Sequence, residues 1–221
     1  TSSAKSGVGT ALNRTSKVWF TLSHGILNEI YYPRVDMPCT RDFGLIVTSG
    51  SNFFSEEKRH CRFEIEPFEH DVPGYRLVNT DLGNRYRIEK EIFADPYRNV
   101  IVQKIRFVPL TGLLADYRLH ALLAPHLGSN GTNNTGWIGD YKGISMLLAD
   151  NPAGYALALG SSTLWHGMSI GFTGYSDGWQ DLSRNFQLTQ QYERAENGNV
   201  ALTGEIDLNA CGGEFILTLG F

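Results

Sequence analysis

The chain contains 221 residues, of which 42% are hydrophobic, and it carries a formal net charge of −4 from 19 basic and 23 acidic side chains. A chain of this length removes roughly 70% of its unfolded surface from water, so one well-buried domain is expected. The charges are spread along the sequence without the basic stripe that binds a phosphate backbone, and no apolar run reaches the roughly 20 residues that cross a bilayer, which argues against nucleic acid and membrane partners.

The first half of the chain combines strand-like runs with a loop that is dense in aromatic and charged side chains. A strand-like run that begins at Gly25 stops at Pro33 and continues into a charged segment that ends at Asp42. Turn-forming residues recur further on and leave segments of about 6 to 12 residues between breaks. These breaks are Pro73-Gly74, Leu82-Gly83-Asn84, Asp95-Pro96 and Asn151-Pro152.

Apolar and polar side chains alternate in three later segments, which is the pattern of strands with one face on a core. Ile101, Gln103, Ile105 and Phe107 share one face of the first segment, and Lys104 and Arg106 share the other. The same alternation runs through residues 116–123 and 200–208. Alternation of this kind predicts antiparallel strands.

Two glycine- and asparagine-rich stretches predict turns or loops. Residues 128–143 are rich in Gly, Asn and Thr, and we expect a surface loop or mobile flap there. Asn197-Gly198 suits a type I′ turn, which needs positive φ at both central residues. The dipeptide therefore predicts a hairpin that pairs residues 191–195 with residues 200–207.

The last residues, Glu214 to Phe221, place Phe215, Leu217, Leu219 and Phe221 on one face. A natural protein seldom stops on such a strand, so we expect the polypeptide to continue beyond it. Helix-length amphipathic stretches are nearly absent. Short strands at this spacing predict an all-β fold in which two large antiparallel sheets stack as one domain over residues 1–221.

Seven short motifs follow one another along almost the whole chain in an order that resembles a known domain. The resemblance is to the N-terminal β-sandwich domain of bacterial and archaeal glucoamylases and glucodextranases, glycoside hydrolase family 15. The motifs are residues 7–11, residues 18–22, Tyr31-Tyr32-Pro33 with Asp36, Pro38, Arg41 and Asp42, residues 95–100, residues 125–128 with Asn130 and Gly131, residues 176–181 and residues 195–202.

The resemblance implies a super-sandwich of the galactose-mutarotase-like type within a longer glycoside hydrolase. Such an enzyme would release glucose from the ends of α-glucans with inversion, using two carboxyl groups roughly 6.5 to 9.5 Å apart. In the family both glutamates come from a helical (α/α)6 barrel, and no position of this chain matches them. We therefore expect a non-catalytic domain with no catalytic residue, no cofactor and no metal, whose partners are that barrel and an α-glucan or malto-oligosaccharide.

The charged loop supplies the first group of candidate contact residues. One interpretation is that Tyr31, Tyr32, Asp36, Arg41 and Asp42 project from the sheet rim toward a partner domain, with Arg41 forming bidentate pairs that hold the loop rigid. The competing interpretation is an internal Arg–Asp brace of the loop. The resemblance implies that this loop faces the barrel and borders its sugar pocket.

Aromatic and acidic residues later in the chain supply the second group. Asp177 and Asp181 flank Trp179, a combination that would line a sugar site, because aromatic faces stack on sugars and carboxylates accept hydroxyl protons. The competing interpretation is a turn in which Asp177-Gly178 sets the geometry and Trp179 fills the core. Trp137, in the polar stretch, is the best candidate for an exposed aromatic platform.

Two other functions stay open at this point. One is a stand-alone carbohydrate-binding module that uses Trp137, Trp179 or the tyrosine pair. The other is a mutarotase-like sugar epimerase, in which His120 or His126 acts as an acid and a glutamate acts as a base on one sheet. His120 lies on the polar side of its strand, which favours a solvated histidine. The three cysteines are widely spaced and suit structural or free thiols.

Overall fold

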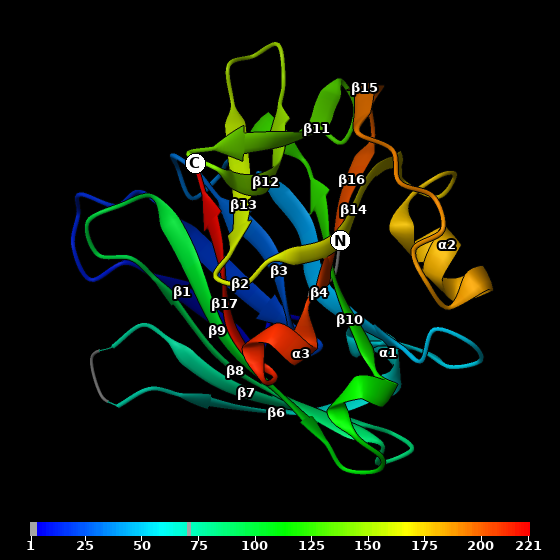
Figure 1. The fold of residues 1–221 in the computed structure, drawn as a ribbon. Coiled ribbons are helices and arrows are strands. Elements are labelled where there is room, and N and C mark those ends of the chain that lie inside the picture. Colours follow the sequence, from blue (N-terminus) through cyan, green and yellow to red (C-terminus); the bar gives the residue numbers. More distant parts are fainter. Residues whose placement is uncertain (1–3, 70–71) are drawn as a thin grey trace.

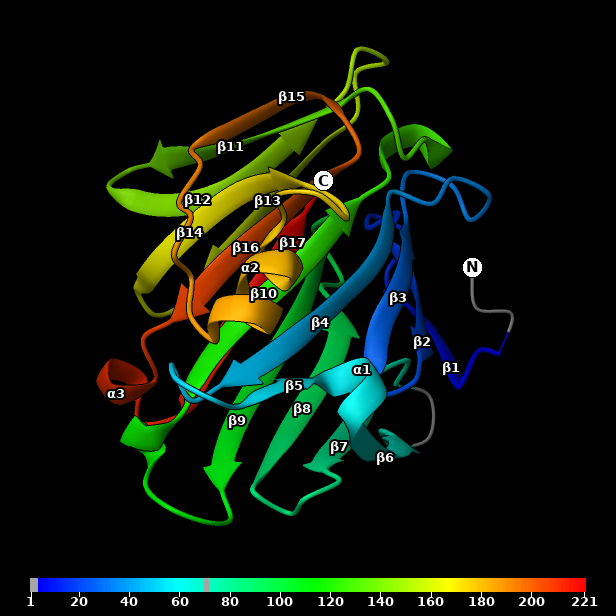
Figure 2. The same ribbon diagram turned by 90° about the vertical axis from the view of Figure 1, so that its right-hand side faces the viewer.

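The computed structural model describes residues 4–69 and 72–221 and consists of two stacked antiparallel sheets (Figures 1 and 2). In eight-stranded sheet A the order is β1 (Gly7–Thr10), β2 (Trp19–Ser23), β3 (Ile26–Tyr31), β4 (Thr40–Thr48), β10 (Arg118–Pro125), β16 (Val200–Ile206) and β14 (Trp165–Phe172), and β5 (Phe54–Glu56) pairs with β4. In nine-stranded sheet B the order is β15 (Arg194–Gly198), β11 (Asn134–Tyr141), β12 (Ile144–Asp150), β13 (Ala156–Ser161), β17 (Glu214–Gly220), β9 (Val100–Pro109), β8 (Tyr86–Ala94), β7 (Tyr75–Asp81) and β6 (Cys61–Pro67). The expected all-β sandwich is confirmed.

Helical segments are few and short. They are α1 (Glu57–His60), α2 (Gly178–Asn185), α3 (Leu208–Cys211) and the 3-10 turns η1 (Leu114–Asp116) and η2 (Leu127–Ser129). Helix α2 lies over the outer face of sheet A (Figure 2). Over residues 4–69 and 72–221, no helix is long and apolar enough to span a membrane.

The main core lies between the two sheets and follows the predicted alternation. Ile101, Ile105 and Phe107 of β9 point into it, and Lys104 and Arg106 face outward. Leu119, Ala121 and Leu123 of β10 and Phe215, Leu217 and Leu219 of β17 complete the same layer. One-sided burial of alternating residues therefore fixes the inward face of each strand.

A buried ion pair crosses this core. Lys90 of β8 and Glu57 of α1 lie 2.6 Å apart, and their side chains are 1% and 0% exposed. Glu57 also accepts from Asn79 of β7 and from the Leu45 amide of β4, the latter at 3.0 Å. Lys90 and Asn79 both donate to the Gly25 carbonyl, at 2.9 and 2.8 Å. The cluster joins sheet B to the start of α1 and to the β2–β3 turn.

The predicted hairpin around Asn197-Gly198 is wrong. Strand β15 pairs with β11 in sheet B, whereas β16 pairs with β10 and β14 in sheet A. Asn197 has a φ of 54°, but Gly198 lies outside the left-handed region that a type I′ turn needs at both positions. Ala195 and Val200 are both buried in the core from opposite sheets. The chain therefore crosses the sandwich at this point instead of folding back within one sheet.

The predicted loop over residues 128–143 is also wrong in part, because β11 occupies residues 134–141. Gly136 of this strand is buried, and a Cβ there would lie 2.8 Å from Ile170 and 2.9 Å from Leu202 of sheet A. The glycine permits close approach of the two sheets. The predicted strand over residues 200–208 is too long at its end, because Leu208 begins α3 after the Asp207 cap.

Candidate functional site

A groove of about 440 Å³ lies on the outer face of sheet A, and we call it the sheet A groove. Its floor is formed by small or apolar outward residues of three adjacent strands. These are Gly44 and Ile46 of β4, Leu122 and Ala124 of β10, and Ala201 of β16. Helices α1 and α2 provide the two sides, so segments that are more than a hundred residues apart in sequence meet here.

One side is built by the start of α2. Asp177 caps this helix by accepting from the Gln180 amide at 2.9 Å, and it also accepts from the Gly174 amide. Gly178 lies directly against Thr203 of β16, which brings the helix onto the sheet. The predicted structural role of Asp177-Gly178 therefore agrees with the geometry, although the element it begins is a helix and not a turn.

Trp179 is half-buried in the same side of the groove. Its indole nitrogen donates to Glu56 at 2.9 Å, and its ring meets Phe54 edge-on with centroids 5.6 Å apart. The Arg59 guanidinium lies 5.6 Å from the ring centroid. Trp179 therefore contributes packing and one polar contact to this side of the groove.

The opposite side carries three charged residues. Lys58 of α1 pairs with Asp42 of β4 at 2.9 and 3.1 Å, and Asn28 donates to the same carboxylate at 2.7 Å. Arg41 is exposed and, among the described residues, has no ion pair within 4.0 Å. The predicted bidentate pairs of Arg41 are wrong, whereas the alternative of an Arg–Asp brace within the loop agrees with the geometry. Arg34 forms this brace by donating to both oxygens of Asp36, at 2.8 and 2.5 Å, which lowers the pKa of Asp36.

The other predicted contact residues lie away from the groove. Tyr31 donates to Glu29 at 2.8 Å, and burial, together with Glu29, raises the pKa of this tyrosine to about 12. Tyr32 stacks on Phe221 with ring centroids 5.4 Å apart at an angle of 23°. Tyr31, Tyr32 and the Arg34–Asp36 pair thus belong to the β3–β4 end of the sandwich.

The carboxylate of Asp181 accepts its hydrogen bonds from the end of α2 and from the loop that follows this helix. Its carboxylate accepts from the side chains of Asn185 and Thr189 and from the amides of Thr189 and Gln190, at distances from 2.5 to 2.8 Å. Burial alone would raise its pKa, but these hydrogen bonds outweigh burial and lower the pKa of Asp181. The geometry supports a structural role, in which Asp181 holds the segment after α2 in place.

Trp137 lies on β11 of sheet B, half-buried, with the Arg194 guanidinium 5.7 Å from its ring. The structure therefore brings Arg41, Asp42, Asp177 and Trp179 into one groove and leaves the remaining five candidates elsewhere. Sequence reasoning missed Glu56, Lys58 and Arg59. The charged run from Glu56 to Arg59 was the available signal, although Glu57 within this run is buried in the core.

The expectation of a solvated His120 is wrong, because this residue is fully buried. Its Nε2 atom lies 3.6 Å from Glu205 of the neighbouring strand. Leu188, which follows α2, packs with Leu182 and Ile46 over this part of sheet A. A buried ring cannot meet a sugar, so the geometry gives no support to ring opening by His120. His126 is half-buried, and burial followed by the charge of Arg41 lowers its pKa.

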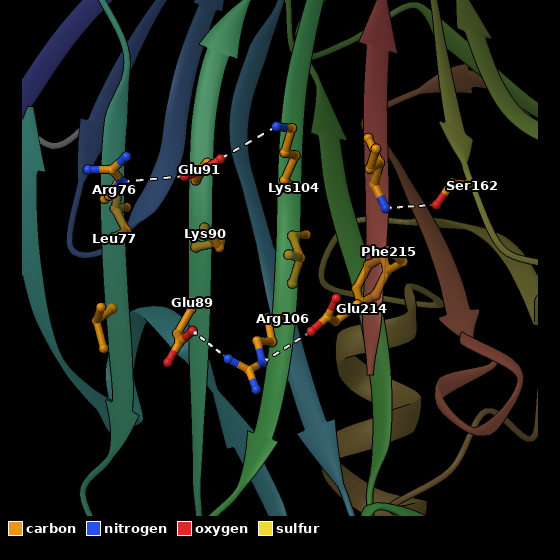
Figure 3. A pocket seen from close by; sticks show the side chains of 13 residues that line it. Arg76, Leu77, Glu89, Lys90, Glu91, Lys104, Arg106, Ser162, Glu214 and Phe215 are labelled. Atoms are coloured by element: carbon orange, nitrogen blue, oxygen red, sulfur yellow. Dashed lines mark hydrogen bonds and ion pairs between the residues drawn. The ribbon is translucent and has the colours of Figure 1, made fainter. Parts of the chain in front are cut away.

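A second hollow, of about 630 Å³, lies on the outer face of sheet B (Figure 3). Glu91 lies 3.3 Å from Arg76 and 3.6 Å from Lys104, and Arg106 lies 3.8 Å from Glu89 and 3.3 Å from Glu214. We call these residues the charge ladder. Cross-strand pairs of this kind are typical of a solvated sheet face, and none of the predicted contact residues lies there.

Metal binding finds no support in residues 4–69 and 72–221, where no three His, Cys, Asp or Glu side chains are grouped to hold an ion. The three cysteines are free thiols, and Cys39 is buried.

Comparison with known proteins decides the family. The family described as "Glucodextranase, domain N" matches residues 1–221. The chain belongs to this family. A glucoamylase from Clostridium sp. (strain G0005) is 40% identical over 220 residues, which cover 100% of this chain and 31% of that protein. The resemblance drawn from the ordered motifs is confirmed.

A solved structure agrees in fold. The crystal structure of a bacterial glucoamylase complexed with acarbose matches this chain with a TM-score of 0.96 and 39% identity. The match covers 99% of this chain and 32% of the glucoamylase. The chain thus spans about a third of the length of both relatives.

Proposed function

We propose that this chain is the non-catalytic N-terminal domain of a glucoamylase-type glycoside hydrolase, and that it packs on and supports a helical catalytic barrel of the same polypeptide. The parent enzyme would release glucose from the ends of α-glucans with inversion. The observation that carries the proposal is the match of the whole chain to about a third of two glucoamylases.

Four carboxyl groups with shifted pKa values support a non-catalytic role. A general acid of a glycosidase needs a raised pKa. The pKa values of Glu29, Asp36, Asp181 and Glu205 are all lowered. In the sheet A groove the carboxylates are engaged by Lys58, by the indole of Trp179 and by the amides at the start of α2.

The direct test is hydrolysis by purified residues 1–221, after cooperative urea unfolding has verified that the sample is folded. We expect no glucose release from maltose or soluble starch. Sustained turnover by contaminant-free protein would overturn the proposal. Support of the barrel is tested separately in the intact gene product, where removal of residues 1–221 should lower the thermal midpoint of the remaining part.

Carbohydrate binding is a second candidate, because the sheet A groove combines an apolar floor, part of an indole ring and charged residues on its rim. Sugars are recognised by such combinations of apolar surface and hydrogen-bonding groups. Titration with malto-oligosaccharides should change the tryptophan fluorescence of Trp179. Flat fluorescence together with flat calorimetry would remove this candidate.

A further inference from the structure

We propose that the sheet A groove is the docking surface for the polypeptide that follows Phe221, and that it receives a carboxylate at Arg41 and small apolar side chains on its floor. The inference rests on the proposed function and names the surface and chemistry through which the domain would act. Three observations carry it.

The first observation is the state of Arg41. Lys58 pairs with Asp42 at 2.9 Å and Arg59 with Glu56 at 3.4 Å, whereas Arg41, on the same rim, has no ion pair among the described residues. A guanidinium presents a rigid fork of donors that matches a carboxylate in bidentate geometry. Arg41 is therefore the group on this rim with free capacity to bind an acidic side chain.

The second observation is the floor. Gly44, Ala124 and Ala201 line it together with Leu122, so apolar surface lies at the centre and charged groups lie at the margin. Protein interfaces share this arrangement, with an apolar centre and a polar rim that often contains an arginine of high energetic weight. Small floor residues leave room for side chains of a partner.

The third observation identifies the occupant. Phe221 stacks on Tyr32, and its amide donates to the Asn99 carbonyl at 3.0 Å. Tyr32 begins the segment that joins β3 to β4, and Arg41 on the rim of the groove is the second residue of β4. A polypeptide that continues from Phe221 starts beside this segment, and both relatives are about three times the length of this chain.

The charge ladder on sheet B is the rival surface. Its six residues already neutralise one another across four strands (Figure 3). Burial of such a ladder would cost desolvation of every member without offering an unpaired group in return. The sheet A groove also carries two ion pairs on its rim, but there Arg41 gains a partner and the apolar surface of the floor is removed from water.

The experiment compares the intact gene product with isolated residues 1–221, and measures association in trans between residues 1–221 and the separately produced remainder. Hydrogen exchange in the rim segments 56–59 and 173–180 should be slower in the intact protein than in isolated residues 1–221. Arg41→Glu and Ala124→Leu should each weaken association by about tenfold or more, because they replace an exposed anchor and fill the floor. Arg76→Glu, on the ladder, is the matched control and should stay within about twofold of wild type.

The outcomes separate the two proposals. Association with protection on the ladder face, or a loss with Arg76→Glu but not with Arg41→Glu, would overturn the docking surface and leave the proposed function standing. Wild-type parts that neither associate nor protect each other would overturn the proposed function itself. Binding of maltoheptaose that requires Arg41, with association unchanged by Arg41→Glu, would assign the groove to a sugar and overturn docking. Unchanged urea midpoints of the variants in residues 1–221 verify that the substitutions leave the fold intact.

Discussion

Replacing Lys90 by methionine removes the cation from the ion pair that crosses the core. Glu57 would keep only two of its three contacts, those from Asn79 and from the Leu45 amide. Its side chain is 0% exposed, so water cannot take the place of the ammonium group. A buried charge left without its partner typically costs about 3–5 kcal/mol of unfolding free energy.

This loss translates into a measurable shift. For a domain of this size each kcal/mol lowers the thermal midpoint by about 2–4 °C, so Lys90→Met should lower it by roughly 6–20 °C. Urea unfolding followed by tryptophan fluorescence gives the free energy, and calorimetry gives the midpoint. The matched control is Lys104→Met, whose side chain is 53% exposed and lies 3.6 Å from Glu91. An exposed pair contributes about 0–1 kcal/mol.

A double substitution separates the lost pairing from lost packing. In Lys90→Met with Glu57→Gln no uncompensated charge remains, so the double variant should be more stable than Lys90→Met alone by at least about 1 kcal/mol. The reasoning would be refuted if Lys90→Met cost no more than the Lys104→Met control. Strict additivity of the two substitutions would refute it equally.

Three further predictions concern α2, an acidic residue and the thiols. Gly178→Ala places a Cβ inside contact distance of Thr203, so it should lower the free energy of unfolding by about 1–3 kcal/mol and shift the fluorescence emission of Trp179. Ser183→Ala on the same helix is the control and should change neither quantity. Because hydrogen bonds lower the folded pKa of Asp181, the stability that it contributes is present above the ordinary carboxyl pKa and is lost as the pH falls through the lowered value. Asp181→Asn should therefore destabilise the chain at neutral pH, and this effect should shrink as the pH falls below the ordinary carboxyl pKa; a difference in urea midpoint that stays constant with pH would contradict this. Burial raises the pKa of Cys39 and Cys211, and raises that of Cys61 to about 12. The native chain should therefore react slowly with a thiol reagent at mildly alkaline pH, whereas the unfolded chain should react at all three cysteines. Rapid labelling of the native chain would contradict this prediction.

Alternation in the sequence identified which side chains enter the core. Ile101, Ile105 and Phe107 of β9 and the apolar residues of β17 point inward as predicted. The period of two is a property of the extended backbone, so it can be read without knowing which strands are neighbours. The ordered motifs likewise identified the family, because the order of motifs is a property of the sequence and can be read without the fold.

Pairing partners could not be read in the same way. Asn197-Gly198 gives the same local signal whether the next strand returns within one sheet or crosses to the other, and here it crosses. The glycine-rich stretch around Gly136 predicts a loop by its composition, whereas in the structure Gly136 allows the two sheets to pack closely. Such distinctions depend on residues that are distant in sequence, so local propensity gives no access to them.

The candidate site shows the same division. The sequence by itself determined the chemistry available, namely the charged β3–β4 segment, the Asp177–Trp179 start of α2 and the alternation that turns Leu122 and Ala124 outward. Only the tertiary structure decided that Arg41, Asp42, Asp177 and Trp179 share one groove, that Asp181 serves its own loop and that His120 is buried. The physical reason is that a strand pattern specifies which face a side chain takes, whereas what covers that face depends on segments that fold back from elsewhere in the chain.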